Sequence, residues 1–188
     1  MNEISLNVLD IAENSVRAQA KLIEIYVAIN TSADTLTITV KDNGTGMDEA
    51  TLAKVCDPFF TSRTTRGVGL GVSFFKAAAE LTGGSFYIKS TLGVGTETSA
   101  TFVLSSIDRM PLGNISETIF TLAVFNETGA EFLYEYEADG TKFSLDTREF
   151  KAVLETDTLN IPDVSAYVKE YLTENTEEVN EKIRGLVL

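Results

Sequence analysis

The stretch TTRGVGLGVSFFKAAAELTGG, Thr64 to Gly84, decides how this sequence is interpreted. Its glycines alternate in GVGLG, and a run with helical character follows and ends on paired glycines. Backbone N–H groups at a helix start, together with the positive end of the helix dipole, suit anionic oxygens. The stretch therefore indicates a phosphate site, and the rest of the sequence has to show which kind.

Two common phosphate sites do not fit. A P-loop requires GxxxxGK[ST] after a strand, and the chain contains no such string. A dinucleotide fingerprint requires its glycines between a strand and a helix, whereas the segment before Gly67, CDPFFTSRTTR, is polar and irregular. GVGLG alone would equally fit a mobile loop beside a helix start, so other motifs must decide.

Composition narrows the class of protein. The chain has 188 residues, 44% of them hydrophobic and 23% charged, which is ordinary for a globular protein. We find no signal-peptide pattern at the start and no apolar segment long enough to cross a membrane. A single cysteine, Cys56, excludes an internal disulfide, so we expect a cytoplasmic protein. The net charge of −13 argues against a nucleic-acid-binding surface.

The chain contains no histidine. A histidine base, a histidine metal ligand and a histidine phosphoacceptor within this chain are therefore all excluded. A carboxylate is then a sensible candidate for a general base.

Charge divides the chain into two halves. Residues 1–106 carry 8 basic and 11 acidic residues, or −3, whereas residues 107–188 carry 7 and 17, or −10. Pro111 and Gly113 provide a turn signal between the halves. We predict one domain over residues 1–106 and a small acidic α+β domain over residues 107–188.

The first half alternates helix and strand patterns. The predicted order is helix 4–20, strands 22–29 and 35–41, helices 49–55 and 70–82, and strands 85–91 and 96–104. In the first helix, the residues predicted to face the core are Leu6, Leu9, Ala12, Val16 and Ala20. This order predicts an α+β fold, a two-layer sandwich whose mixed sheet carries helices on one face.

The second half has weaker patterns and no chemical motif that we can name. It predicts strands at Thr118–Asn126 and 130–138, with an Asp-Gly turn leading to a third short strand. Asp146 has capping spacing before a short helix, and Pro162 opens a last helix.

Four motifs indicate a binding site for a phosphate-containing ligand only when they are taken together. The first helix carries Asp10, Asn14 and Arg17 at i, i+4 and i+7, so they share one face. DNGTGM directly follows a strand, so Asp42 can accept a hydrogen bond from an exocyclic amine while the glycines admit a flat ring. The glycine loop precedes the helix at Leu70, and GVGT at 93–96 forms a turn. Each motif alone has an ordinary explanation, such as a solvated helix face, an Asp-Asn-Gly turn or a hairpin connection.

In this order and spacing the motifs resemble the GHKL, or Bergerat-fold, ATP-binding domain of histidine kinases, type II topoisomerases, mismatch-repair ATPases and a chaperone family. LDIAENSVRAQA is similar to the N box, DNGTGM to the first glycine box, and DPFFTSR to the F box of histidine kinases. RGVGLGVSFFKAAAELTGG resembles the second glycine box, and STLGVGTETSATFVL the closing strands. The resemblance covers roughly residues 3–104 and implies a histidine-kinase-like ATP-binding domain.

The resemblance implies ATP and Mg²⁺ as ligands. Asn14 would coordinate Mg²⁺ beside the phosphates, and Asp42 would bind the adenine amino group. Asp57–Arg66 would form a mobile lid, and Thr96 would lie near the base or the phosphates. The implied nucleotide-binding residues are Asn14, Asp42, Gly44 and Gly46 against the base, Phe59, Phe60 and Arg66 in the lid, Gly67, Gly69, Leu70 and Gly71 around the triphosphate, and Thr96. For the two phenylalanines, packing in the core is the alternative to a role as lid latch.

Asp10 and Arg17 are the catalytic candidates. ATP-hydrolysing members of the family carry an acid where this chain has Asp10, and that acid orients the attacking water. Here it is Asp rather than Glu, with a reach one methylene shorter. The topoisomerase and mismatch-repair branch has an acid at the position of Arg17, whereas histidine kinases often have a basic residue there that contacts the phosphates. Together with the F box and the short lid, Arg17 favours the kinase-like branch.

Three functions stay open on the sequence. The chain is a kinase-like domain that phosphorylates a partner, an ATPase whose hydrolysis drives a conformational change, or a non-catalytic ATP-dependent switch. A partner protein would be contacted through the acidic residues 107–188, and a homodimer is also left open. A DNA clamp fits least, because the acidity opposes it.

Overall fold

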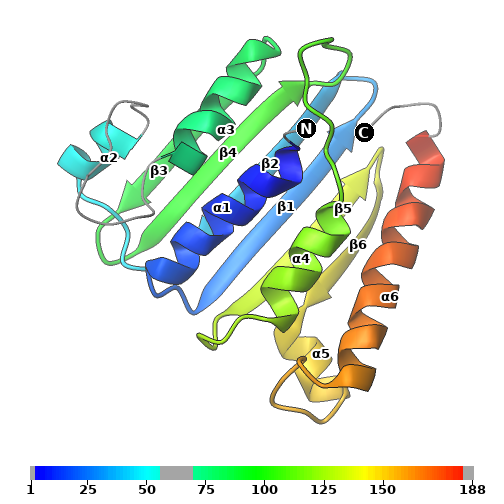
Figure 1. Ribbon diagram of the computed structural model, residues 1–188. Coiled ribbons are helices and arrows are strands. Elements are labelled where there is room, and N and C mark those ends of the chain that lie inside the picture. Colours follow the sequence, from blue (N-terminus) through cyan, green and yellow to red (C-terminus); the bar gives the residue numbers. More distant parts are fainter. Residues whose placement is uncertain (1–2, 56–69, 184–188) are drawn as a thin grey trace.

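The computed structural model describes residues 3–55 and 70–183 and shows two layers, a sheet with helices on one of its faces (Figure 1). The helices are α1 (Ile4–Arg17), α2 (Glu49–Val55), α3 (Leu70–Leu81), α4 (Ile115–Val124), α5 (Thr147–Val153) and α6 (Pro162–Asn180), followed by the short 3-10 helix η1 (Glu181–Ile183). The strands are β1 (Leu22–Asn30), β2 (Thr35–Asp42), β3 (Ser85–Thr91), β4 (Gly95–Val103), β5 (Glu131–Ala138) and β6 (Thr141–Asp146). In the described part of the chain, no helix is long and apolar enough to span a bilayer.

The six strands form one mixed sheet in the order β3-β4-β2-β1-β5-β6. Every neighbouring pair is antiparallel except β1 and β5, which run parallel. In the register, Ile25 of β1 lies between Val40 of β2 and Tyr134 of β5. The predicted α+β fold class, with a mixed sheet and helices on one face, is confirmed.

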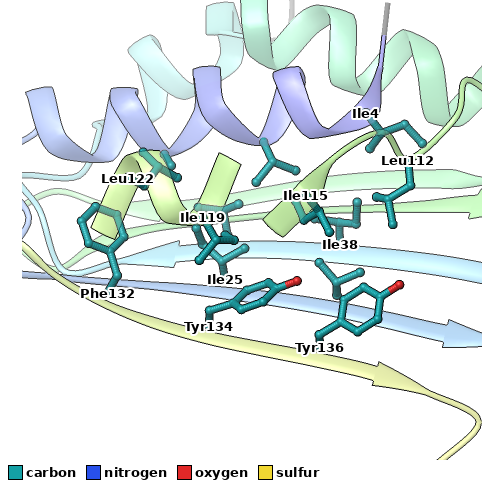
Figure 2. Packing of buried hydrophobic residues seen from close by; sticks show 14 of the residues in the cluster. Ile4, Ile25, Ile38, Leu112, Ile115, Ile119, Leu122, Phe132, Tyr134 and Tyr136 are labelled. Atoms are coloured by element: carbon teal, nitrogen blue, oxygen red, sulfur yellow. The ribbon is translucent and has the colours of Figure 1, made fainter. Parts of the chain in front are cut away.

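The core lies between the helices and one face of the sheet. Alternate residues of the central strands are buried, as period-two side-chain geometry requires. Figure 2 shows where the layers meet: Ile4 from α1 and Ile119 from α4 lie above Ile25, Ile38 and Tyr134 of the sheet. Among residues 3–55 and 70–183, no helix covers the opposite face of the sheet (Figure 1).

The predicted strand at Thr118–Asn126 is wrong, because these residues lie largely in helix α4. Asn114 caps the helix, and its side chain accepts a hydrogen bond from the backbone N–H of Glu117 at 3.0 Å. The helix packs against α1, α6 and β5 and exposes Glu117 and Thr121, but the polar Ser116 and Thr118 are buried, so polarity does not mark the buried face. A short apolar run of this kind cannot be assigned to helix or strand from periodicity alone.

The predicted core face of the first helix is also partly wrong. Leu6 is half exposed, whereas Ile4, Val8, Ile11 and Ser15 form the buried stripe. The spacing of these four residues also fits a helix face, so the sequence offered two neighbouring faces. The buried one was selected by the position of the sheet.

Residues 107–183 continue the sheet rather than starting another one. The segment between β4 and α4 packs on the start of α1, where the backbone N–H of Ile4 donates to the Pro111 carbonyl at 3.0 Å. Leu112 next to it is 2% exposed. Strand β5 then pairs with β1 from Leu22 to Ile29, over the whole length of β5. The division of the chain into independent domains 1–106 and 107–188 stays a prediction.

Candidate nucleotide-binding site

A pocket of about 280 Å³ opens in the helix layer beside α1. Its lining is mainly apolar with a few polar groups, which is the usual character of a small-molecule site. Among the predicted site residues, Asn14, Arg17, Asp42, Gly46 and Thr96 line it. Its other lining residues are Ile11, Ser15, Ala18, Thr45, Met47, Thr51, Val55, Val72, Ile88 and Thr98.

The carboxylate of Asp42 is the best-defined polar group in the pocket. Asp42 ends strand β2, and its Oδ2 accepts a hydrogen bond from the Ser15 hydroxyl at 2.7 Å. Its Oδ1 accepts from the backbone N–H of Gly44 at 2.8 Å. Each carboxylate oxygen has a further lone pair, so the group can accept from a ligand amine without losing either contact.

The loop after β2 is fastened on both sides. The Asn43 side-chain oxygen accepts from the backbone N–H groups of Lys21 at 2.8 Å and Leu22 at 2.9 Å. Thr45 donates its N–H to the Ala18 carbonyl at the end of α1, at 2.8 Å. Its own carbonyl accepts from the N–H of Gly93 at 2.7 Å, in the turn between β3 and β4. The loop is therefore held in place by backbone contacts before any ligand arrives.

Close packing of this loop explains its two glycines. Gly46 has φ +62°, and a Cβ atom there would lie 2.1 Å from the Thr91 carbonyl oxygen. A Cβ atom on Gly44 would lie 2.7 Å from the Ala18 oxygen. Any side chain at either position would push the loop away from α1 or β3. Their predicted contact with a base stays a prediction.

Ser90 on β3 joins the loop to Thr96. Its hydroxyl accepts from the backbone N–H of Met47 at 2.8 Å and lies 2.9 Å from the Thr96 hydroxyl and 3.0 Å from the Gly95 carbonyl oxygen. Thr96 is paired with Asp42 in the register of β2 and β4. This network sets the position of Thr96 at the edge of the pocket.

Asn14 and Arg17 are already in contact on α1. Arg17 Nη1 donates to the Asn14 Oδ1 at 2.7 Å, and Nη2 pairs with Glu13 Oε2 at 2.8 Å. Both side chains of the ion pair are about half exposed, so the pair adds little stability. The contact matters because it places a cationic group directly at the oxygen predicted to coordinate Mg²⁺.

Asp10 lies one helical turn before Asn14, exposed and next to the start of α3. A Cβ atom on Gly71 would lie 2.9 Å from the Asp10 Cβ. Gly71 therefore allows α3, which begins at Leu70, to approach α1 closely. The structure brings Asp10 and Gly71 together, and the predicted contact of Gly71 with a triphosphate stays a prediction.

Asp48 caps α2 near the pocket residue Thr51. The pKa of Asp48 lies below its usual value, because the Thr51 backbone N–H donates to its carboxylate at 2.7 Å, with a further contribution from the Thr51 side chain. The charged cap fixes α2 beside the pocket.

A family described as histidine kinase-, DNA gyrase B-, and HSP90-like ATPase matches residues 3–106. This range exceeds half of the chain and contains every pocket residue described above. The chain belongs to this ATPase family. Membership of the family supports ATP binding.

The relatives of this ATPase domain include sensor kinases. Sensor protein kinase FleS of Pseudomonas aeruginosa is 42% identical over 110 residues, which cover 58% of this chain and 27% of FleS. Sensor histidine kinase YvrG of Bacillus subtilis is 32% identical over 87 residues, which cover 44% of this chain and 15% of YvrG. The chain thus matches less than a third of the length of either relative.

A solved structure supports the fold. The crystal structure of the N-terminal domain of a DNA repair protein superposes with a TM-score of 0.55 at 15% identity. The superposition covers 81% of this chain and 57% of the other. A likeness at this identity concerns the fold alone.

Five predicted nucleotide-binding residues of the ATPase domain lie outside the described residues: Phe59, Phe60, Arg66, Gly67 and Gly69. The glycine-rich loop and the lid that the sequence predicts therefore stay predictions.

Sequence reasoning missed Ser15, Ser90 and Thr98. Ser15 carried a signal, because it is a hydroxyl residue placed in the apolar stripe of α1 after Ile11. A polar group in such a stripe needs a partner, and here the partner is Asp42, 27 residues later. Ser90 and Thr98 carried no local signal, since only the strand register brings Thr98 into the pocket lining and Ser90 against Thr96.

Proposed function

We propose that the pocket binds ATP with its adenine against Asp42 and its phosphates toward Asn14, Arg17 and the start of α3. The observation that carries this proposal is the Asp42 carboxylate, which is fixed by Ser15 and Gly44 and open to a further donor. The adenine 6-amino group is such a donor. The apolar lining suits the flat faces of a base.

The amide oxygen of Asn14 fits the role of an Mg²⁺ ligand. It is a hard, neutral oxygen of the kind that binds Mg²⁺ beside phosphates, and it already accepts from the cationic Arg17. Bound Mg²⁺ would neutralise charge on the phosphates. Because two cations compete for this oxygen, Arg17 Nη1 has to move off Asn14, and the phosphates would then offer it an anionic partner in addition to Glu13.

We propose further that the domain is a kinase-like ATPase or kinase that works with a partner protein. Asp10 would orient the attacking group, and Arg17 would stabilise charge on the phosphates, since phosphoryl transfer depends mainly on positioning and charge. The chain has no histidine, so an acceptor within it would be Ser or Thr; otherwise it is water or a group on the partner.

The alternative is a non-catalytic switch in which ATP controls partner binding. The Arg17 contacts favour this alternative as a second candidate, because the arrival of a nucleotide would rearrange Glu13, Asn14 and Arg17 on α1. A partner contacted through residues 107–188, a homodimer and a cytoplasmic location are further predictions.

Binding and turnover are tested separately. Asp42→Asn keeps the shape of the side chain but replaces one acceptor oxygen by a donor, so ATP affinity measured by calorimetry should fall at least about tenfold. Asp163→Asn, an exposed acid-to-amide change on α6, a helix that contributes no residue to the pocket lining, is the matched control and should leave affinity unchanged. If both variants bind ATP with equal affinity, this pocket is not the ATP site.

γ-Labelled ATP then shows where the phosphate goes. Label released as free phosphate, and lost in Asp10→Asn, indicates an ATPase. Label transferred to an added partner protein indicates a kinase. Retained binding without release or transfer in the presence of that partner indicates a switch.

A further inference from the structure

We propose that the Ser15 hydroxyl determines the selectivity of the pocket for adenine over 6-oxopurines. This inference rests on the proposed ATP site and names the residue that gives the site its base preference. Ser15 lies on α1 and is 4% exposed, yet it lines the pocket, and its hydroxyl is 2.7 Å from Asp42 Oδ2.

The Ser15 hydroxyl donates its hydrogen bond to the Asp42 carboxylate. A serine inside a helix usually donates to the carbonyl four residues earlier, and for Ser15 this is Ile11. That distance is 3.4 Å, at the limit of a hydrogen bond, whereas the distance to Asp42 is 2.7 Å. Ser15 thus uses its single donor to hold a carboxylate on a different element.

This contact fixes which hydrogen-bonding groups the pocket presents to a base. With Ser15 on Oδ2 and the Gly44 N–H on Oδ1, the carboxylate is held from two sides and cannot rotate freely. It offers only acceptor lone pairs to a ligand. A 6-amino group donates to them, whereas the 6-oxo group of hypoxanthine or guanine would place an oxygen against a carboxylate oxygen.

Selectivity therefore depends on how rigidly Asp42 is held. Without the Ser15 hydroxyl, the carboxylate can turn away from a 6-oxo group, and it also loses its alignment with a 6-amino group. A site that hydrogen-bonds a particular ligand group discriminates strongly against analogues that lack it, and a mobile partner group weakens this discrimination.

The test compares ATP with inosine triphosphate, which differs only in carrying a 6-oxo group and an N1 proton. Dissociation constants are measured by calorimetry for the unmodified chain, Ser15→Ala and Ser15→Cys. Ser15→Ala should weaken ATP binding about tenfold and lower the preference for ATP over inosine triphosphate by a similar factor. Ser15→Cys keeps a side chain of similar shape but a weaker donor, so its preference should be intermediate.

Ser5→Ala is the matched control. Ser5 is buried on the same helix, and its hydroxyl contacts Glu3 rather than the pocket. This variant should keep the full preference for ATP. Thermal unfolding of each variant shows whether it is folded, and if Ser15→Ala is not, Ser15→Cys provides the result.

The outcomes separate this inference from the proposed function. If the unmodified chain prefers ATP and Ser15→Ala keeps that preference, or weakens both nucleotides equally, Ser15 only packs and the inference is overturned. If the unmodified chain binds neither nucleotide, the proposed function itself fails. A lost preference in Ser15→Ala, with Ser5→Ala unchanged, supports the assignment.

Discussion

The same face of one sheet is used differently in its two halves. Over β2 and β4 the helix layer leaves a pocket whose polar groups include Asp42 and Thr98. Over β5 and β6 that face is filled by aromatic rings, with Tyr134 and Phe143 in edge-to-face contact at 5.8 Å between ring centroids. Phe143 also meets Tyr171 of α6 at 6.0 Å.

The difference follows from the side chains that each half contributes. Small residues such as Ala18 and Gly46 and the hydroxyl of Thr98 leave space beside α1. Large rings from β5, β6 and α6 instead pack against one another, and edge-to-face pairs of this kind add stability beyond the area that they bury. We infer that the aromatic half stabilises the sheet, while the other half holds the proposed ligand site.

The largest expected effect comes from removing the aromatic half. A chain of residues 1–106 exposes the β5-pairing edge of β1 and uncovers the part of α1 that α4 packs against. The loss should equal or exceed the whole stability of an ordinary domain, roughly 5–15 kcal/mol. Circular dichroism during heating should show no cooperative transition.

A cooperative transition in the 1–106 chain, with ATP binding retained, would contradict this expectation. It would instead establish the division into two independent domains that the sequence predicts.

The next effect concerns the metal-dependent part of ATP binding. Asn14→Ala removes the proposed Mg²⁺ ligand, so the gain in ATP affinity on adding Mg²⁺ should fall roughly tenfold to a hundredfold. Arg17→Ala should instead weaken ATP binding without Mg²⁺, because a cationic group proposed to face the phosphates is lost. The gain in ATP affinity on adding Mg²⁺ should remain, because Asn14 keeps its amide oxygen and loses only a competing donor. Calorimetry with Mg²⁺ and with a chelator measures both.

If Asn14→Ala leaves the gain in ATP affinity on adding Mg²⁺ unchanged, other residues bind the metal. The Arg17→Ala variant is the internal control, since the two residues are neighbours on the same turn of α1.

A smaller effect is expected at the contact between α1 and α3. Gly71→Ala places a methyl group where the Asp10 Cβ is 2.9 Å away, so the two helices have to separate. We expect a loss of about 1–3 kcal/mol in the free energy of unfolding, measured by urea denaturation.

The same substitution in an Asp10→Gly background removes the steric conflict. There Gly71→Ala should be nearly neutral or stabilising, because alanine favours helix by about 1 kcal/mol over glycine. If Gly71→Ala lowers the free energy of unfolding equally in both backgrounds, the steric conflict does not involve the Asp10 side chain.

The smallest expected effect is a difference in stability between substitutions at two buried tyrosines of the aromatic half. Tyr136 donates to the Asn180 side-chain oxygen at 2.7 Å, whereas the Tyr134 hydroxyl has no partner within the described residues. Tyr136→Phe should therefore cost about 1 kcal/mol in urea denaturation. Tyr134→Phe is the matched control and should cost nothing or stabilise, since it removes an unsatisfied buried hydroxyl.

Alkaline pH tests the same two residues. Burial raises the pKa of Tyr136 to about 12 and that of Tyr134 well above its usual value of 10.0. The folded state keeps these protons above pH 10, where unfolded tyrosines lose theirs, so the free energy of unfolding should fall between pH 10 and about 12. Tyr136→Phe should show a shallower fall, and an identical pH profile would contradict the assignment.

Local patterns predicted most of the pocket half. The strands at 22–29, 35–41 and 85–91 alternate with period two, and the helix at 49–55 was predicted with its observed limits. Ordered motifs identified Asn14 and Asp42 as neighbours in a site, and both line the pocket. This worked because each motif combines a local conformation with a chemical group, and both are properties of a short segment.

The sequence by itself thus determined the fold class, the order of most elements and several of the residues that line the pocket. Tertiary structure alone decided that α4 is a helix, that β5 joins β1 in parallel, and that Ser15 holds Asp42. These features depend on contacts between segments far apart in the chain. In α4 only Glu117 and Thr121 are exposed, whereas the polar Ser116 and Thr118 are buried, so polarity does not follow the helical period. A hydrogen bond across 27 residues leaves no spacing to recognise.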